Sequence, residues 1–154
     1  MTMDERQPTG LDVVGIGSMA VDRVHRTSRI LGLDEKGMLQ DVDERGPVVR
    51  AIGGVVLNHL GWAAVLGLRT GIFGRQGDDE DGRLLRAAMD GLGIEKNLIL
   101  GDAPTTFAEI FVDAAAGRTI YMAPGATAET DAAHIRDYHS DFIRRARRVS
   151  TEVS

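Results

Sequence analysis

A chain of 154 residues with 43% hydrophobic and 27% charged residues has the size and composition of one globular domain, or of part of a larger one. Its formal net charge of −5 argues against a nucleic-acid-binding protein, because that function needs a basic face. The chain contains no cysteine, which excludes disulfides, thiolate catalysis and cysteine-based zinc sites.

The N-terminal residues 1–10 predict a flexible tail, because the sequence MTMDERQPTG is polar and holds no apolar signal core. No apolar run in the chain approaches the length of a membrane span, so we expect no membrane partner. We expect a cytoplasmic protein.

The first predicted strand is the short apolar run from Leu11 to Ile16. Residues 23–52 then mix short apolar pieces with turn formers, which predicts short exposed strands joined by turns. A mostly apolar helix is expected from Val55 to Leu66, with Gly67 as its stop signal.

The second half of the chain continues to alternate strands with helices. The remaining elements are expected, in order, as a buried strand at Thr70–Phe73, an amphipathic helix at Asp81–Leu92, a strand at Asn97–Leu100, a hairpin of Thr105–Asp113 with Thr119–Met122, a helix from Thr130 or Asp131 to about Arg147, and a strand at Val149–Val153. This alternation predicts a parallel α/β sheet, and such sheets bind ligands beyond the carboxyl ends of their strands. Segments 17–22, 53–58 and 74–79 should therefore meet at one rim.

A glycine pattern follows the first strand. Gly15, Gly17 and Ala20 fit the fingerprint G-x-G-x-x-A of dinucleotide-binding domains, which also begins after a strand. That fingerprint requires a helix to open at once, and the residues after Ala20 carry no helical stripe. A Rossmann-type dinucleotide-binding domain is therefore the weaker alternative.

Two polar residues are candidates for ligand contact at this rim. Asp22 lies six residues past the strand end, where a carboxylate can accept hydrogen bonds from two vicinal sugar hydroxyls; a turn-capping aspartate is the alternative. Asn58 follows Gly53 and Gly54, which have no Cβ and let the backbone approach a ligand closely. For Asn58 the alternative is a buried, hydrogen-bonded amide.

The histidines suggest no site. His25, His134 and His139 lack the spacing of a metal site, and His134 and His139 are five apart on a predicted helix, which should not align them on one face; His59 is expected to pack or to lie at the surface. The acidic run 78–81 is expected to begin a helix, because acidic side chains favour the first turn.

Three motifs in this order resemble those of the ribokinase-like sugar and nucleoside kinases, the PfkB family. The resemblance runs from about Leu11 to the C-terminus. Gly17 to Asp22 (GSMAVD) matches the family's G-S-x-x-x-D, Gly53 to Asn58 (GGVVLN) matches its G-G-x-x-x-N, and Gly77 to Gly82 (GDDEDG) matches its G-x-D-x-x-G turn.

The resemblance implies a ribokinase-like α/β fold with a parallel-sheet core and a small β-sheet lid. Residues 11–154 would be the N-terminal portion of a kinase domain, truncated before its C-terminal half, with lid strands at about 23–52 and 105–123. The implied activity is ATP-dependent phosphorylation of a hydroxyl on a sugar or related polyol, with ATP and Mg²⁺ as cofactors. A sugar or nucleoside is the implied partner, and the lid would also form a homodimer.

Site residues carry over by position. Asp22, Gly53, Gly54 and Asn58 would hold the sugar, and Glu109 would lie over it on a lid strand. Glu152 resembles a glutamate that reaches toward the active site from a strand end.

Two departures from the family pattern bear on activity. Val55 and Val56 stand where many sugar kinases carry Lys-Gly, which puts ribose itself in doubt. The second family signature, D-T-x-G-A-G-D, is absent, and with it the catalytic base and the glycine turn that stabilises developing charge. The nucleotide pocket and the magnesium-linked N-x-x-E motif are missing too. We therefore expect no catalytic, ATP-binding or metal-binding residue here, and no turnover by the chain alone; a non-catalytic sugar- or nucleoside-binding module is the alternative.

Overall fold

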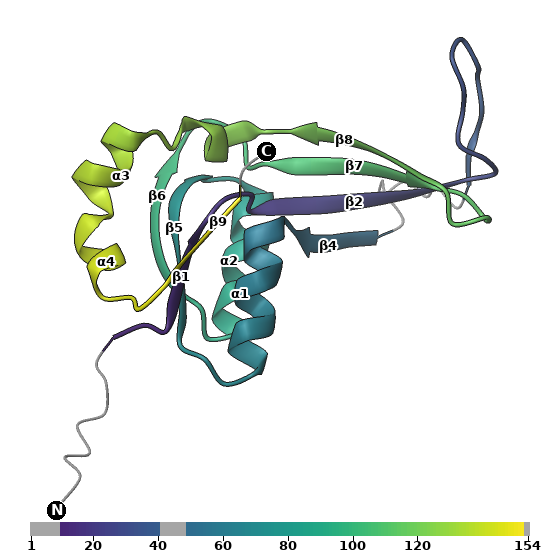
Figure 1. Ribbon diagram of the computed structural model, residues 1–154. Helices are drawn as coiled ribbons and strands as arrows, with labels where there is room; N and C mark the ends of the chain where they lie inside the picture. Colours follow the sequence, from purple (N-terminus) through teal and green to yellow (C-terminus); the bar gives the residue numbers. More distant parts are fainter. Residues whose placement is uncertain (1–9, 41–48, 153–154) are drawn as a thin grey trace, which may run out of the picture.

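The structure, a computed structural model, describes residues 10–40 and 49–152, so the expected tail lies almost wholly outside the described residues (Figure 1). A first sheet has four parallel strands in the order β6-β5-β1-β9. The predicted parallel α/β core is confirmed. Its strands are β1 (Val13–Ile16), β5 (Thr70–Gly77), β6 (Glu95–Gly101) and β9 (Val149–Thr151).

Helices cover both faces of this sheet (Figure 1). Helices α1 (Val55–Val65) and α2 (Glu80–Gly91) pack on one face, around Ile72 of β5. On the other face, α4 (Ser140–Arg144) places Phe142 against Phe73, and α3 (Ala132–Tyr138) lies beside it. Because Ile72 and Phe73 are consecutive in a strand, they point to opposite faces, and each anchors one helical layer.

The expected small β-sheet is present, and we call it the lid. Strand β2 lies at its centre, parallel to β7 on one side and antiparallel to β4 and β3 on the other. Figure 1 shows the lid extending away from the helices to the right. Its strands are β2 (Ala20–Thr27), β3 (Leu39–Gln40), β4 (Val49–Gly53), β7 (Phe107–Val112) and β8 (Arg118–Ala123).

Two strands run further than predicted. Strand β2 begins at Ala20, three residues before the segment 23–52 in which short strands were predicted and in which β3 and β4 also lie. Strand β5 continues past Phe73 to Gly77, because Gly74 to Gly77 stay paired with β6 in register. In both cases neighbouring strands satisfy the backbone groups of residues that have weak strand propensity. The hairpin of β7 and β8 is confirmed.

The single long helix predicted up to Arg147 is wrong. A 3₁₀ helix over Gly125–Glu129 precedes α3, and the chain leaves helical geometry at His139, which separates α3 from α4. The cap at Asp131 is confirmed, because its side chain accepts a hydrogen bond of 2.7 Å from the His134 amide. The break also brings the His134 and His139 rings to 5.0 Å, contrary to expectation.

Among the described residues, no helix has the length and apolar character needed to cross a membrane.

Candidate functional site

The carboxyl ends of β1 and β9 meet at one rim, because these strands are parallel neighbours with Ile16 opposite Thr151. One residue beyond β9, the Glu152 carboxylate accepts hydrogen bonds from the Ser18 amide at 2.9 Å and the Ser18 hydroxyl at 2.6 Å. Glu152 is therefore held at the rim by Ser18.

Gly54 caps α1 against this same segment. Its φ of +98° lies in a region that side-chain-bearing residues rarely adopt, and a Cβ there would lie 2.0 Å from the Ser18 carbonyl oxygen. The close approach that requires glycine at this position is to the chain's own backbone.

Asp22 lies against the other glycine of the pair. Strands β2 and β4 are antiparallel with Ala20 opposite Gly53, and a Cβ on Gly53 would lie 2.2 Å from Oδ1 of Asp22. Burial raises the pKa of the Asp22 carboxyl. No donor among residues 10–40 and 49–152 pairs with this carboxylate. A partly desolvated carboxylate that these residues leave unpaired can accept hydrogen bonds from a ligand.

Asn58 lies one turn into α1, where its backbone N–H donates a hydrogen bond of 3.0 Å to the Gly54 carbonyl. The residue is exposed, so the alternative of a buried amide is wrong. The start of α1 thus presents an amide side chain to solvent next to the Gly54 turn.

Glu109 is not brought together with Asp22. The register pairs Asp22 with Ala108 and Arg23 with Glu109, so Glu109 shares the opposite face of the lid with Arg23. There it accepts hydrogen bonds from Arg23 at 3.1 Å and meets the His25 ring at 2.5 Å. Burial alone would raise the Glu109 pKa, but the hydrogen bonds from His25 and Arg23 outweigh it and lower the pKa.

A hollow of about 400 Å³ opens beside the Glu152 and Ser18 pair. The hydroxyl groups of Thr106 and Thr127 are hydrogen-bonded to each other at 2.9 Å, and both residues line the hollow. Asp22 and the glycine pair are not in its wall. The hollow therefore brings Glu152 and Ser18 together, and it does not include the Asp22 carboxylate.

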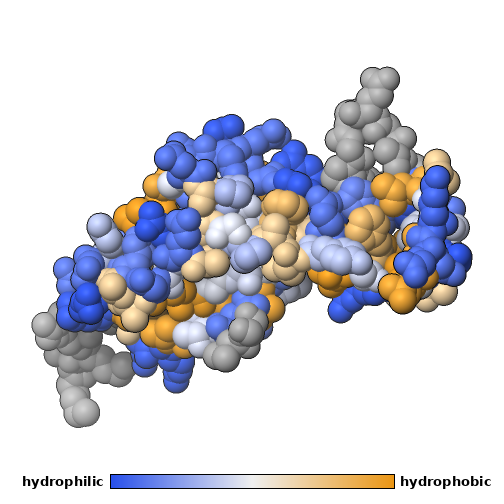
Figure 2. Space-filling view, turned by 90° about the horizontal axis from the view of Figure 1, so that it is seen from above, coloured by the Kyte–Doolittle hydropathy of each residue, from blue (hydrophilic) through white to orange (hydrophobic). Residues whose placement is uncertain are grey.

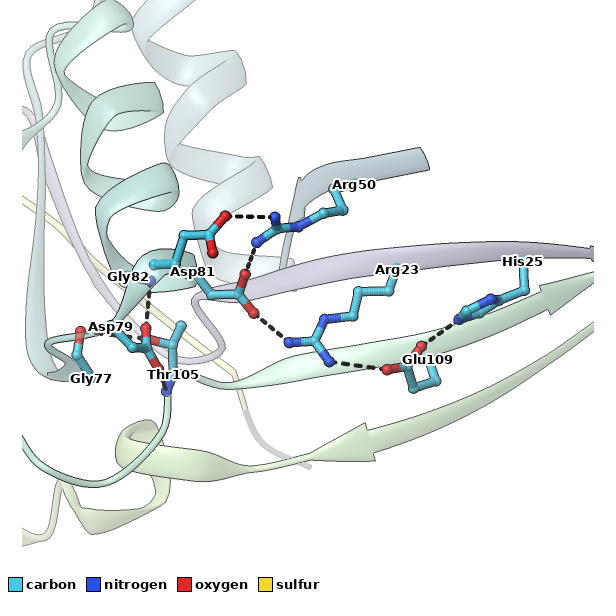
Figure 3. A network of polar contacts seen from close by, with 10 residues as sticks. Arg23, His25, Arg50, Gly77, Asp79, Asp81, Gly82, Thr105 and Glu109 are labelled. Atoms are coloured by element: carbon cyan, nitrogen blue, oxygen red, sulfur yellow. Dashed lines mark hydrogen bonds and ion pairs between the residues drawn. The ribbon is translucent and has the colours of Figure 1, made fainter. Parts of the chain in front are cut away.

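Sequence reasoning missed the second role of Asp79. The acidic run begins a helix as expected, since Asp79 caps α2 by accepting from the Gly82 amide at 2.8 Å. Its carboxylate also accepts from the amide and the hydroxyl of Thr105, at 2.8 and 2.7 Å (Figure 3). The family motif G-x-D marks Asp79, but no local signal points to Thr105.

Sequence reasoning also missed a network of ion pairs between the lid and α2 (Figure 3). Asp81 of α2 accepts from Arg23 of β2 at 2.6 Å and from Arg50 of β4. Only tertiary contact joins residues this far apart in sequence.

The described residues contain no group of three or more His, Asp, Glu or Cys that could hold a metal ion. The Mg²⁺ that the resemblance implies therefore finds no ligand set that the geometry identifies in this part of the chain.

The chain matches the pfkB family carbohydrate kinases over residues 11–152. No curated protein matches it. Its fold is similar to that of an acarbose kinase of microbiome origin, with a TM-score of 0.71 and 24% identity over 93% of this chain and 46% of that one.

Two further structures are similar. Adenosine kinase from Sinorhizobium meliloti has a TM-score of 0.70 and 23% identity, covering 93% of this chain and 47% of that one. Ribokinase from Cryptococcus neoformans in complex with ADP has a TM-score of 0.66 and 21% identity, covering 75% and 35%. The chain thus spans less than half the length of these structures. At these identities the likeness shows the fold, which is ribokinase-like, and the match over residues 11–152 shows that the chain belongs to the pfkB family of carbohydrate kinases.

Proposed function

We propose that this chain carries the acceptor-binding part of a kinase that transfers a phosphoryl group from ATP to a hydroxyl of a sugar or related polyol. The observation that carries the proposal is the Asp22 carboxylate, which lies against Gly53 where the lid joins the core sheet and has no paired donor among residues 10–40 and 49–152. A carboxylate that is not committed to the protein can accept hydrogen bonds from two hydroxyls of one polyol.

The neighbouring groups complement this carboxylate. The side chain of Asn58 offers both a donor and an acceptor from the first turn of α1, which Gly54 caps. Glu152 stands beyond Ser18 at the hollow and can accept from a further hydroxyl. Glu109 was expected to lie over the sugar; its contacts with Arg23 and His25 favour a structural role in the lid instead.

Phosphoryl transfer depends on positioning together with electrostatic stabilisation of the transferring group. ATP and Mg²⁺ would supply the phosphoryl group and neutralise its charge, and the described residues offer no metal cluster for this purpose. We therefore propose that the chain binds its acceptor and does not turn over alone. The cytoplasmic location stays a prediction.

Titration calorimetry with D-ribose, D-fructose, adenosine and NAD tests the binding proposal. We expect at least one of the first three to bind and NAD not to bind. Asp22→Asn should lower the affinity by ten- to a hundredfold, because hydrogen bonds to a charged group contribute about 1.5–3 kcal/mol. The control Glu95→Gln removes a carboxylate that pairs with Arg145 away from the site and should leave affinity unchanged. Equal affinity of wild type and Asp22→Asn would refute the proposal.

Turnover is tested separately by incubating the purified chain with ATP, magnesium chloride and the same acceptors. We expect no ADP above background. Steady ADP formation that depends on an acceptor would contradict the absence of turnover, and it would leave the binding proposal standing.

We also propose that the lid forms a homodimer. The lid face that carries Asp22 also carries Val49, Ile120 and Met122, whose exposed fractions are 46%, 43% and 53%. Figure 2 shows hydrophobic patches at the lid end of the molecule, at the right of the view. Exposed apolar surface of this kind marks an interface. Sedimentation velocity should show a dimer that the double variant Ile120→Glu/Met122→Glu converts to a slower species.

A further inference from the structure

A line of alternating charges runs from the start of α2 across three strands of the lid (Figure 3). Asp81, in the first turn of α2, stands at its centre with a side chain only 8% exposed. It accepts from Arg23 of β2 at 2.6 Å and from Arg50 of β4, whose other nitrogen donates to Glu80 at 2.9 Å. One core carboxylate thus holds two lid strands.

The guanidinium of Arg23 is held on three sides. Beyond its bond to Asp81, it donates to Glu109 of β7 at 3.1 Å and lies over the Phe107 ring at 4.0 Å from the ring centre. A planar guanidinium with two carboxylates and an aromatic face is fixed in orientation, which a lysine ammonium could not reproduce. The third lid strand, β7, is therefore tied to Asp81 through Arg23.

Arg23 is the direct neighbour of Asp22 on β2, and side chains alternate across a strand. When Arg23 is anchored to α2 on one face, the Asp22 carboxylate is presented on the other face, above Gly53. The angle between the lid and the core therefore sets the position of the candidate acceptor carboxylate.

We propose that Asp81 is a positioning residue that latches the lid to helix α2 through Arg23 and Arg50 and so holds Asp22 in place. This inference rests on the proposed function in assigning Asp22 to the acceptor. The latch itself is a property of the described contacts and can be tested without a ligand. Removing the buried carboxylate takes from each guanidinium its link to Asp81 and leaves only Glu109 for Arg23 and Glu80 for Arg50, so the lid loses its fixed angle.

The latch is tested by spin-label distance measurement between Ala87→Cys on α2 and Arg118→Cys on β8. Both residues are exposed, and the chain has no other cysteine to compete for the label. We expect one narrow distance distribution in the doubly labelled chain. Asp81→Asn should broaden or shift it, and Arg23→Lys, which keeps the charge but loses the fork, should do so to a smaller degree.

The matched control is Glu95→Gln, which removes an ion pair with Arg145 that does not touch the lid. It should reproduce the narrow distribution. An Asp81→Asn chain that folds, by circular dichroism, and keeps the narrow distribution overturns the latch. If Asp81→Asn does not fold, Arg50→Gln removes one arm only, and the same criterion applies to it.

The consequence for binding is measured by calorimetry on the same variants with D-ribose, D-fructose and adenosine. We expect Asp81→Asn to weaken binding at least tenfold while Asp22 is intact, and Asp22→Asn to weaken binding with an unchanged distance distribution. Binding that Asp81→Asn leaves unaltered, despite a broadened distribution, overturns the positioning role. Failure of the wild-type chain to bind any acceptor overturns the proposed function. The contact of Asp81 with the lid is then tested by the distance measurement without reference to binding.

Discussion

At the scale of single residues, the two adjacent glycines have different reasons to be glycine. Gly54 adopts a φ of +98° and leaves no room for a Cβ beside the Ser18 carbonyl. Gly53 has no such backbone constraint, and only the mobile end of the Asp22 side chain occupies its Cβ position. Substitution by alanine should therefore separate folding from binding.

Gly54→Ala should destabilise the fold by about 2–3 kcal/mol, because strain and a backbone clash act together. For a chain of this size that corresponds to a fall in Tm of roughly 5–10 °C in a thermal melt followed by circular dichroism. Gly91→Ala is the control, since no atom lies within 4 Å of its Cβ position and alanine favours helix. A Gly54→Ala chain as stable as the control would contradict the argument.

Gly53→Ala should fold but bind poorly. The new methyl group would displace the Asp22 carboxylate, which can rotate away at small cost to stability. Calorimetry with the acceptor that binds the wild type should show an affinity at least tenfold lower, while the Tm changes by only a few degrees. Retained affinity would mean that the position of Asp22 above Gly53 is not the binding geometry.

The sequence alone predicted that Asp22, Gly53 and Gly54 lie at one rim, because parallel strands present their carboxyl ends together, but Asp22 meets Gly53 through the antiparallel pairing of β2 with β4. It could not assign Glu109 to a face. That assignment depends on the register between β2 and β7, and a shift of one residue would turn Glu109 to the side of Asp22. No local pattern records a register between segments more than eighty residues apart.

At the scale of elements, the start of α2 connects the core to the lid. Asp79 caps the helix and also binds Thr105, which begins the approach to β7. Burial alone would raise the Asp79 pKa, but the hydrogen bonds from Thr105 and Gly82 outweigh it and lower the pKa. The ionised Asp79 side chain is therefore a stabilising part of the native state.

Asp79→Ala should destabilise the chain by about 2–3 kcal/mol, which combines the loss of a helix cap with unpaired donors on Thr105. Because the folded pKa is depressed, this stabilisation is complete above the ordinary value of 3.8 and is lost as the pH falls below it. Urea unfolding at pH 7 and pH 3 measures the destabilisation and its dependence on pH. The free energies of unfolding of the wild type and of Asp79→Ala should lie closer together at pH 3 than at pH 7.

Asp78→Ala is the matched control, because the Asp78 side chain is 63% exposed and, among the described residues, pairs only with Arg86 at 3.2 Å. Its effect should stay within about 0.5 kcal/mol. Equal effects of the two substitutions would show that the acidic run acts through its charge alone.

Elements whose apolar residues recur with a regular period could be predicted from the sequence, whereas the point at which a helix is broken could not. The apolar face of α2 and the alternation in β7 are local properties. The break between α3 and α4 instead follows from His139, whose ring is fully buried and meets Asn97 of β6 at 2.5 Å. A helical pattern continues through residue 139, so only the tertiary contact explains why the helix ends there.

At the scale of the whole molecule, His139 makes stability depend on pH. Its ring donates through Nδ1 to the Asn97 oxygen, which leaves Nε2 as an acceptor that finds no partner among the described residues. Burial, together with the nearby His134, lowers the His139 pKa. The native state therefore disfavours the proton that the unfolded chain binds below about pH 6.5.

The depressed pKa fixes the sign of this effect. The free energy of unfolding should be constant above about pH 6.5 and should fall by up to about 1.4 kcal/mol per pH unit below it. Urea unfolding between pH 5 and pH 8 checks the slope. His139→Gln should reduce the slope, whereas His59→Gln, which removes an exposed histidine on α1, should preserve it. A slope unaffected by His139→Gln would assign the pH dependence to other groups.

The outer face of α1 carries an exposed apolar patch that bears on self-association of the protein. Trp62, Val65 and Leu66 are 71%, 64% and 79% exposed and lie together on the last turns of the helix. An apolar patch of this kind on a helix favours association with another apolar surface. We therefore expect the chain to self-associate through α1 as its concentration rises, in addition to any contact through the lid.

Trp62 is the only tryptophan, so its emission reports directly on this face. Emission should shift to shorter wavelength as the concentration rises, because association removes the indole from water. The double variant Val65→Glu/Leu66→Glu should abolish the shift and the faster-sedimenting species that accompanies it. The lid variant Ile120→Glu/Met122→Glu should leave the Trp62 shift intact, since its substitutions lie on β8. A shift that persists with both charges on α1 would place the association surface elsewhere on the molecule.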